Sequence, residues 1–198
     1  MNLGLLGAIP AGAKYVLGAV GPEGVTDSKT WPDACKMLSD ADIKTLLPKS
    51  SAVTRKGQHG QFLSGGETAN YSTCKYAIPE PGDYTGQPSA VEISLEAVGD
   101  PAAVADRWKR NFDSARKSAA KYPDQWADYS SGSLGGAKCY SNGSNLSCAK
   151  GHYKFSVQGF SARESQPSDG PDSSAAQRLG YLEQVTANVA KTLALRMD

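Results

Sequence analysis

The chain has 198 residues, of which 39% are hydrophobic, and its 21 basic and 20 acidic side chains leave a formal net charge of +1 at pH 7. This length is sufficient for one domain with a substantial core. The balanced charge excludes the basic footprint of a nucleic-acid-binding protein and gives no attraction to an anionic membrane surface.

Residues 1–29 are interpreted as a flexible or residual leader segment ahead of a single domain at 30–198. No basic residue precedes their apolar stretch, although a secretory signal peptide requires one. Lys14 and several glycines interrupt the stretch before it reaches the roughly 20 apolar residues of a membrane span. We therefore expect at most a peripheral association with membranes.

The domain is predicted to open with a short helix and an irregular segment. Ser39 is a suitable N-cap for a helix that carries Ile43, Leu46 and Leu47 on one side. Residues 55–66 hold glycine, glutamine and serine without hydrophobic periodicity, and we interpret them as a mobile loop.

Two strands are expected next. In residues 72–78, Cys74 and Tyr76 share one face, and residues 91–98 alternate apolar and polar side chains more regularly. The connection between the two strands contains three prolines and is interpreted as a rigid loop that displays Tyr84.

A long helix follows these strands. Asp100 and Pro101 are typical of an N-cap and a first helical position, and apolar side chains recur every three or four residues over 104–122. The opposite side of the helix has an excess of positive charge that includes Arg110 and Lys117. This basic face is a candidate surface for an acidic partner, although most such faces are only solvated.

Residues 137–150 have the pattern of a β-hairpin with a cysteine on each arm. If Gly143 and Ser144 form its two-residue turn, Cys139 faces Cys148 at a non-hydrogen-bonded position where a disulfide can form. A turn that begins one residue earlier would misalign the cysteines.

The hairpin is predicted to belong to a three-stranded meander. Residues 124–131 are interpreted as a loop before it, and residues 153–158 alternate as its third strand. A final amphipathic helix, capped by Asp172, continues with leucines and valines to Leu193. The whole order predicts an α+β fold: an antiparallel sheet of about five strands, covered on one face by two long amphipathic helices, plus a short N-terminal helix.

The four cysteines are expected to form two disulfides. They lack the C-x-x-C spacing of zinc and redox sites, so a structural role is favoured. Three pairings are possible; with Cys139 joined to Cys148, Cys35 and Cys74 remain as the second pair. Disulfides indicate an oxidising compartment, and we expect a secreted or cell-envelope protein.

No catalytic constellation, metal site or cofactor motif stands out. His59 and His152 are the two histidines, and neither has a nucleophile or a second ligand beside it in the sequence. The serines and glycines form neither a nucleophile elbow nor a phosphate-binding loop. We therefore expect a protein that is not an enzyme, with a secreted hydrolase based on a histidine and a loop serine as the alternative.

Aromatic side chains in loops are better candidates for binding, because they give a large contact area at low entropic cost. Tyr84 and Trp126 are the preferred pair among four such residues, the others being Trp31 and Tyr129. The expected partner is a small molecule, a lipid or an envelope protein, with no cofactor and no nucleic acid.

Two short motifs resemble a known family. Residues 32–39 and 71–76 are similar to the Pro-x-x-Cys-leucine start and the cysteine-plus-aromatic strand of actinobacterial envelope lipoproteins of the domain-of-unknown-function 3558 family. The order of elements is also similar to that of the extracellular sensor domains of PknH-like kinases. The resemblance implies an extracytoplasmic ligand-binding or sensing domain without catalytic residues. No cysteine precedes Cys35 to match the lipid-modified cysteine of such lipoproteins.

Overall fold

The computed structural model describes most of the predicted domain. The described residues are 24, 26, 28–48, 53–64, 67–79, 88–121, 123, 126–142, 145–160 and 184–197. No helix within these ranges is long and apolar enough to cross a bilayer.

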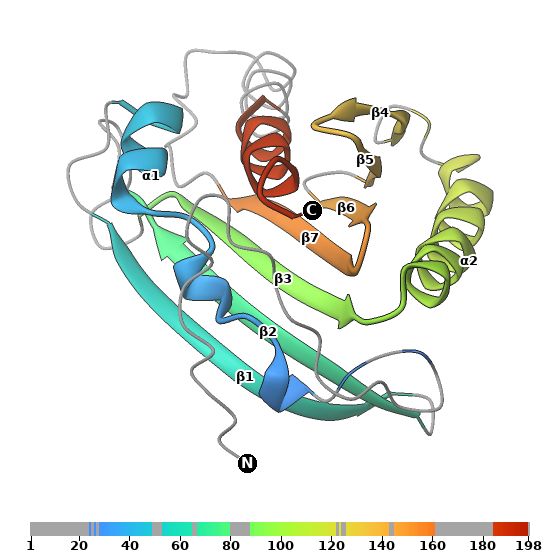
Figure 1. Ribbon diagram of the computed structural model, residues 1–198. Coiled ribbons are helices and arrows are strands. Elements are labelled where there is room, and N and C mark those ends of the chain that lie inside the picture. The colour runs from blue at the N-terminus through green and yellow to red at the C-terminus, as the bar shows by residue number, and fades with distance from the viewer. Residues whose placement is uncertain are drawn as a thin grey trace.

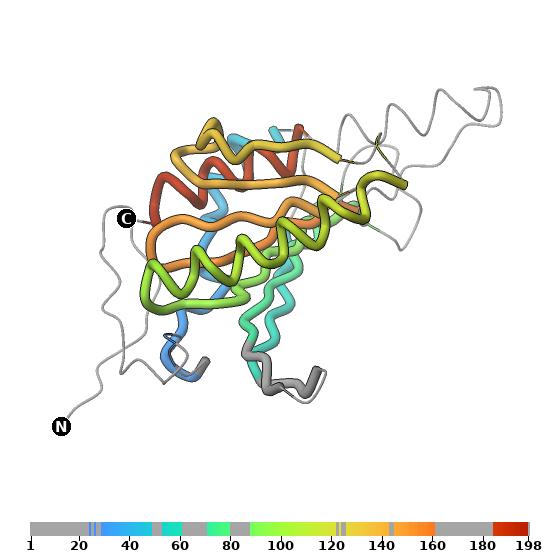
Figure 2. The backbone as a smooth tube through the Cα atoms, turned by 90° about the vertical axis from the view of Figure 1, so that its right-hand side faces the viewer, coloured from blue at the N-terminus to red at the C-terminus, as the bar shows by residue number. Residues whose placement is uncertain are grey.

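One antiparallel sheet organises the fold (Figure 1). Within the described ranges it has seven strands in the order β1-β2-β3-β7-β6-β5-β4. The strands are β1 (Thr54–Ser64), β2 (Glu67–Ala77), β3 (Ala90–Val98), β4 (Trp126–Leu134), β5 (Ala137–Asn142), β6 (Asn145–Lys150) and β7 (Tyr153–Phe160). β1 and β2 run past the end of β3 and project from the rest of the sheet (Figure 2).

The predicted sheet of about five strands is wrong, because two segments interpreted as loops are strands. β1 occupies most of the predicted loop at 55–66, and β4 occupies most of the one at 124–131. Both are edge strands of the sheet. An edge strand with little side-chain burial has no need of alternating apolar residues, so its sequence lacks the pattern by which strands are recognised.

The short helix and the long helix begin where the sequence predicts. α1 (Asp40–Leu46) has Ser39 as its N-cap, and Ser39 and Asp42 form a reciprocal capping box. α2 (Pro101–Ala119) has Asp100 as its N-cap, whose carboxylate accepts hydrogen bonds from two main-chain amides of the first turn. Two short 3-10 helices, η1 (Ser28–Thr30) and η2 (Ala34–Lys36), precede α1.

The predicted cover of one face by two long helices is also wrong. The C-terminal helix is described over residues 184–194, while its predicted start at Asp172 lies outside the described residues. Its Val189 packs in one cluster with Cys139, whereas Trp108 of α2 packs in a second cluster with Tyr140. Consecutive strand residues point to opposite faces, so the two helices lie on opposite sides of the sheet (Figure 1).

The hairpin of β5 and β6 has the predicted register. Asn142 pairs with Asn145, and Cys139 pairs with Cys148, which is the alignment expected from a turn at residues 143–144. The Cα atoms of the two cysteines are 4.1 Å apart and their disulfide is formed, so this prediction is confirmed.

The N-terminal segment joins the sheet before η1 begins. Thr26, which the sequence places in the leader, donates hydrogen bonds from its main-chain N–H and its hydroxyl to the carbonyl of Val98. The indole Nε1 of Trp31 donates to the carbonyl of Thr26 at 3.1 Å, and Trp31 is 2% exposed. Trp31 is therefore a core residue rather than an exposed loop aromatic.

A buried cation lies on the face of the sheet that α2 covers. The register between β3 and β7 shifts between Leu95 and Ala97, and Glu96 at this shift forms an ion pair with Lys154 of β7. The Lys154 side chain is 3% exposed, and its burial lowers the pKa of the ammonium from 10.5 to about 8.

Candidate functional site

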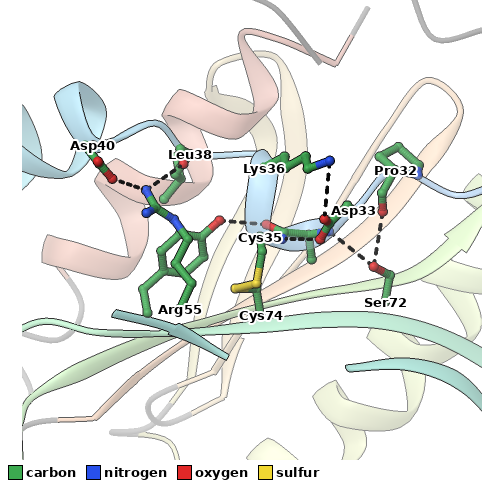
Figure 3. Close-up of a disulfide and its surroundings, with 11 residues drawn as sticks. Pro32, Asp33, Cys35, Lys36, Leu38, Asp40, Arg55, Ser72 and Cys74 are labelled. Carbon is green, nitrogen blue, oxygen red and sulfur yellow. Dashed lines mark hydrogen bonds and ion pairs between the residues drawn. A yellow bond between two sulfur atoms is a disulfide. The ribbon is translucent and has the colours of Figure 1, made fainter. Parts of the chain in front are cut away.

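Three residues on one face of β2 hold the N-terminal segment against the sheet. Ser72, Cys74 and Tyr76 alternate along the strand, so their side chains point the same way. Cys74 forms the second predicted disulfide with Cys35, and the Cα atoms of this pair are 4.9 Å apart (Figure 3). The Tyr76 hydroxyl donates a 2.6 Å hydrogen bond to the carbonyl oxygen of Ala34. Burial raises the pKa of this phenol to about 12.

Ser72 completes the attachment of η2. Its hydroxyl donates to the carbonyl of Pro32 at 3.1 Å and accepts from the N–H of Ala34 at 3.2 Å (Figure 3). Asp33 caps η2 by accepting from the N–H of Cys35 at 2.9 Å. These main-chain groups are thus satisfied by side chains, which fixes η2 as a rigid wall beside the sheet.

Gly57 allows this wall to approach β1 closely. It lies opposite Cys74 in the pairing of β1 with β2. A Cβ atom at position 57 would stand 3.0 Å from the Sγ of Cys35. Because that sulfur is held in a disulfide, it has little freedom to move away. Glycine is therefore the residue that lets η2 and β1 pack at this distance.

An open groove of about 610 Å³ lies between the N-terminal segment and the outer strand of the sheet. This volume is within the usual range for ligand sites. One wall comes from η1, η2 and the residues between them, and the other comes from β1. The groove is lined by Lys29, Trp31, Asp33, Cys35, Gly57, Gln58 and His59.

Arg55 ties β1 to the start of α1. Its guanidinium forms an ion pair with Asp40 and donates to the carbonyl of Leu38 at 3.4 Å (Figure 3). The central carbon of this guanidinium, Cζ, stands 5.4 Å from the centre of the Tyr76 ring, in a cation–π contact. Arg55 therefore has a structural role, whereas the neighbouring Lys56 is exposed and makes no ion pair with another described residue.

The preferred aromatic candidates do not meet at this groove. Tyr84 lies outside the described residues. Trp126 is the first residue of β4 rather than a loop residue, and its ring stacks on that of Tyr140 with centroids 5.3 Å apart. Phe112 of α2 also contacts Trp126, at 5.5 Å between ring centroids. Trp126 thus contributes to the packing of α2 on the sheet.

The basic face of α2 is present on the surface. Arg110 and Lys117 are both exposed, and neither forms an ion pair with another described residue. Lys109 is neutralised by Asp113, at 2.6 Å between Nζ and Oδ2. This face remains a candidate for an acidic partner and lies on the opposite side of the sheet from η2.

The two histidines are far apart. His59 lies on β1, whereas His152 lies between β6 and β7 with its Nδ1 2.8 Å from the carbonyl oxygen of Gly99. β1 carries His59, and β7 begins one residue after His152. Because β2 and β3 lie between β1 and β7, these two strands are about 14 Å apart at the usual strand spacing. The serine opposite His59 is Ser72, which is 1% exposed and already holds η2. This serine is therefore inaccessible to a substrate.

No cluster of three or more histidine, cysteine, aspartate or glutamate side chains suited to a metal ion occurs in the described ranges. All four cysteines are in disulfides. Two disulfides indicate an oxidising, extracytoplasmic environment.

Sequence reasoning missed the groove because it missed β1. The glycine at position 57 falls within the segment interpreted as a mobile loop, and the sequence indicates no role for Asp33. One signal was available: if Cys74 points inward from a strand and pairs with Cys35, the segment around Cys35 must lie on that strand. The position of β1 under the same segment has no comparable signal.

Comparison with family models, with curated proteins and with solved structures finds no match to the chain.

Proposed function

We propose that the protein is an extracytoplasmic binding or sensing domain, without catalytic activity of its own, that takes its ligand in the groove between η2 and β1. The observation that carries this proposal is the disulfide-held wall of the groove. Cys35, Asp33 and their neighbours are fixed by a covalent bond and by side-chain hydrogen bonds. A wall that is already ordered loses little entropy when a ligand binds, which favours affinity.

The composition of the groove supports binding rather than catalysis. Its lining combines the indole of Trp31 with polar and charged side chains, and such polar groups can fix the orientation of a ligand. His59 is the histidine of the lining, and the strand serine opposite it is buried and already bonded to η2. The ligand class remains a small molecule, a lipid or a segment of an envelope protein. The resemblance to actinobacterial envelope lipoproteins is consistent with the same compartment.

The proposal is tested by following the main-chain amide signals of Gly57, Gln58 and His59 by NMR while small molecules, lipids and peptides are added in turn. We expect at least one class to shift these signals selectively. Replacement of Cys35 and Cys74 by serine removes the wall and should abolish the response. Replacement of Cys139 and Cys148 by serine is the matched control, because it removes the other disulfide and leaves the groove lining intact.

A result in which no class of compound shifts these signals in the folded wild-type protein would overturn the proposal. So would an equal response in the variant that lacks the wall, shown to be folded by circular dichroism.

A further inference from the structure

The main chain of the edge strand β1 is open to solvent in the first half of the strand. Residues from Thr54 to His59 are all exposed. Gly57 has no side chain, so its exposure is an exposure of the main chain itself. β1 has 11 residues and pairs with β2 in continuous register, without a bulge. An edge of this kind is a template for another strand.

The direction of its free hydrogen-bonding groups follows from the pairing of β2. The N–H of Ile78 donates to the carbonyl of Ser89 at 2.7 Å, in register with the pairing of β2 and β3. Hydrogen-bonded and non-hydrogen-bonded pairs alternate along antiparallel strands. Cys74 and Tyr76 therefore also direct their main-chain N–H and C=O groups toward β3. The alternate residues Thr73 and Lys75 direct theirs toward β1.

The same alternation applies to β1. Lys56 and Gln58 lie opposite Lys75 and Thr73, whose main-chain groups point toward β1, so they form the bonds to β2. Arg55 and Gly57 consequently direct their N–H and C=O groups outward. These outward groups make no hydrogen bond with another described residue.

We infer that β1 binds an extended peptide segment of a partner protein as an additional strand, with acidic side chains placed against Lys56. This inference rests on the proposed function, because the groove flanks the same stretch of β1, and it names the class of ligand. Main-chain bonds to Arg55 and Gly57 would supply affinity, and the groove would accept the side chains that point toward η2.

Charge favours an acidic partner over a second copy of this chain. The charge of Arg55 is paired with Asp40, but Lys56 has no such partner among the described residues, and β1 contains no acidic residue that a second β1 strand could place against it. Lys56 also lies opposite Lys75, whose ammonium is directed to the ring of Phe160 at 5.0 Å. The ammonium of Lys56 is thus exposed on the surface, where it can pair with an acidic side chain of an added strand.

The test uses a fluorescent peptide that matches β1 in length and alternates valine with glutamate. Two further peptides carry N-methyl groups on alternate residues, one on the odd positions and one on the even positions. Only one of these two sets of amides can face β1, so we expect one methylated peptide to lose binding and the other to retain it. Equal behaviour of the two methylated peptides would overturn the inference.

A second measurement reports on the protein side. On binding the unmethylated peptide, the amides of Arg55 and Gly57 should gain protection from hydrogen exchange, while those of Lys56 and Gln58, already bonded to β2, should change little. Lys56→Glu should weaken binding roughly two- to thirtyfold, and a peptide with lysine in place of glutamate should reverse that preference. Lys138→Glu, at an exposed lysine of β5, is the matched control.

The outcomes separate this inference from the proposed function. If small molecules or lipids shift the groove signals but the peptide does not bind, strand addition is wrong and the binding groove stands. If the protein itself forms a concentration-dependent dimer that protects Arg55 and Gly57, the occupant is a second copy and the acidic-partner inference is wrong.

Discussion

Arg196 and Asp42 form an ion pair that joins the end of the chain to its first α-helix, with 2.5 Å between Nη2 and Oδ1. The same guanidinium donates from Nη1 to the carbonyl of Met37 at 3.0 Å. Because Asp42 is also part of the capping box of α1, one carboxylate serves both the local helix and a contact across 154 residues of sequence.

The acid stability of the protein should depend on this pair. Burial raises the pKa of Asp42, but the hydrogen bonds from Arg196 and Ser39 outweigh it and hold the pKa below 3.8. The carboxylate therefore contributes stability above pH 3.8 that is lost as the pH falls through its folded-state pKa. Arg196→Met should lower the unfolding free energy, measured in urea, by about 1–3 kcal/mol at neutral pH. The unfolding free energy of the variant should also fall less steeply than that of the wild type as the pH is lowered. Arg110→Met is the control, and an equal loss in both variants would contradict this role.

Tyr76→Phe should lower the free energy of unfolding by about 0.5–1.5 kcal/mol, because it removes the 2.6 Å hydrogen bond to the carbonyl of Ala34 and leaves that carbonyl only the 3.3 Å bond from the N–H of Met37. The phenol has a raised pKa of about 12, against an ordinary value of 10.0. Its contribution is thus complete below pH 10 and is lost as the pH rises to about 12. The variant should lack that alkaline loss. Tyr140→Phe is the control, since its hydroxyl bonds to no other described residue; a similar cost there would argue against the assignment.

Lys154→Met should change how stability depends on pH. Below about pH 8 the ammonium of Lys154 is charged in both the folded and the unfolded protein. Between about pH 8 and 10.5 it is neutral in the folded protein and charged in the unfolded chain, so the unfolded chain binds more protons. The unfolding free energy of the wild type should therefore rise relative to that of the variant across this window, by roughly 3 kcal/mol in total. Guanidinium titrations at a series of pH values measure the difference. A flat difference for Lys154→Met would refute the lowered pKa of this ammonium and would show that its ion pair with Glu96 offsets the burial.

Gly57→Ala tests the close packing of η2 on β1. The added methyl group would meet the disulfide sulfur of Cys35 at 3.0 Å, and we expect a loss of about 1–3 kcal/mol in thermal or urea unfolding. At Gly60 a Cβ would meet the hydroxyl oxygen of Tyr71 at 3.0 Å and its ring carbon Cζ at 3.2 Å, but no disulfide holds this side chain in place. Gly60→Ala should therefore cost less. The reverse order would show that the sulfur does not constrain position 57.

The two disulfides should contribute unequally. Cys35 and Cys74 close a loop of 39 residues, whereas Cys139 and Cys148 close one of 9. On the loop-entropy model these correspond to about 4 and about 2–3 kcal/mol. Unfolding of the two double-alanine variants measures the difference, and thiol counting in denaturant should find no free thiol in the wild type. A larger loss from the short loop would contradict the entropic ordering.

Local sequence signals predicted the parts of the fold that depend on local chemistry. Ser39 and Asp100 identified two helix starts because capping needs particular side chains at fixed positions. Cys139 and Cys148 identified the register of β5 and β6 because only one alignment allows a disulfide. Such features are determined within about ten residues, so an isolated sequence carries them.

The remaining features depend on contacts between distant segments. β1 and β4 are strands because β2 and β5 supply their partners, and their own sequences lack a clear alternation. The side of the sheet chosen by α2 follows from Trp108 packing with Tyr140, which periodicity within the helix cannot specify. The groove depends on η2 lying over Gly57, and that contact joins two segments whose sequences show no mutual signal.

The two edges of the sheet differ in a way that limits assembly. β1 offers a regular edge, but β4 loses its register with β5 between Tyr129 and Leu134. A head-to-tail contact, in which β1 of one molecule joins β4 of the next, would need two regular edges. The irregular β4 is therefore a poorer template for strand addition than β1. A contact of β1 with β4, which could repeat from molecule to molecule as an open fibre, is disfavoured.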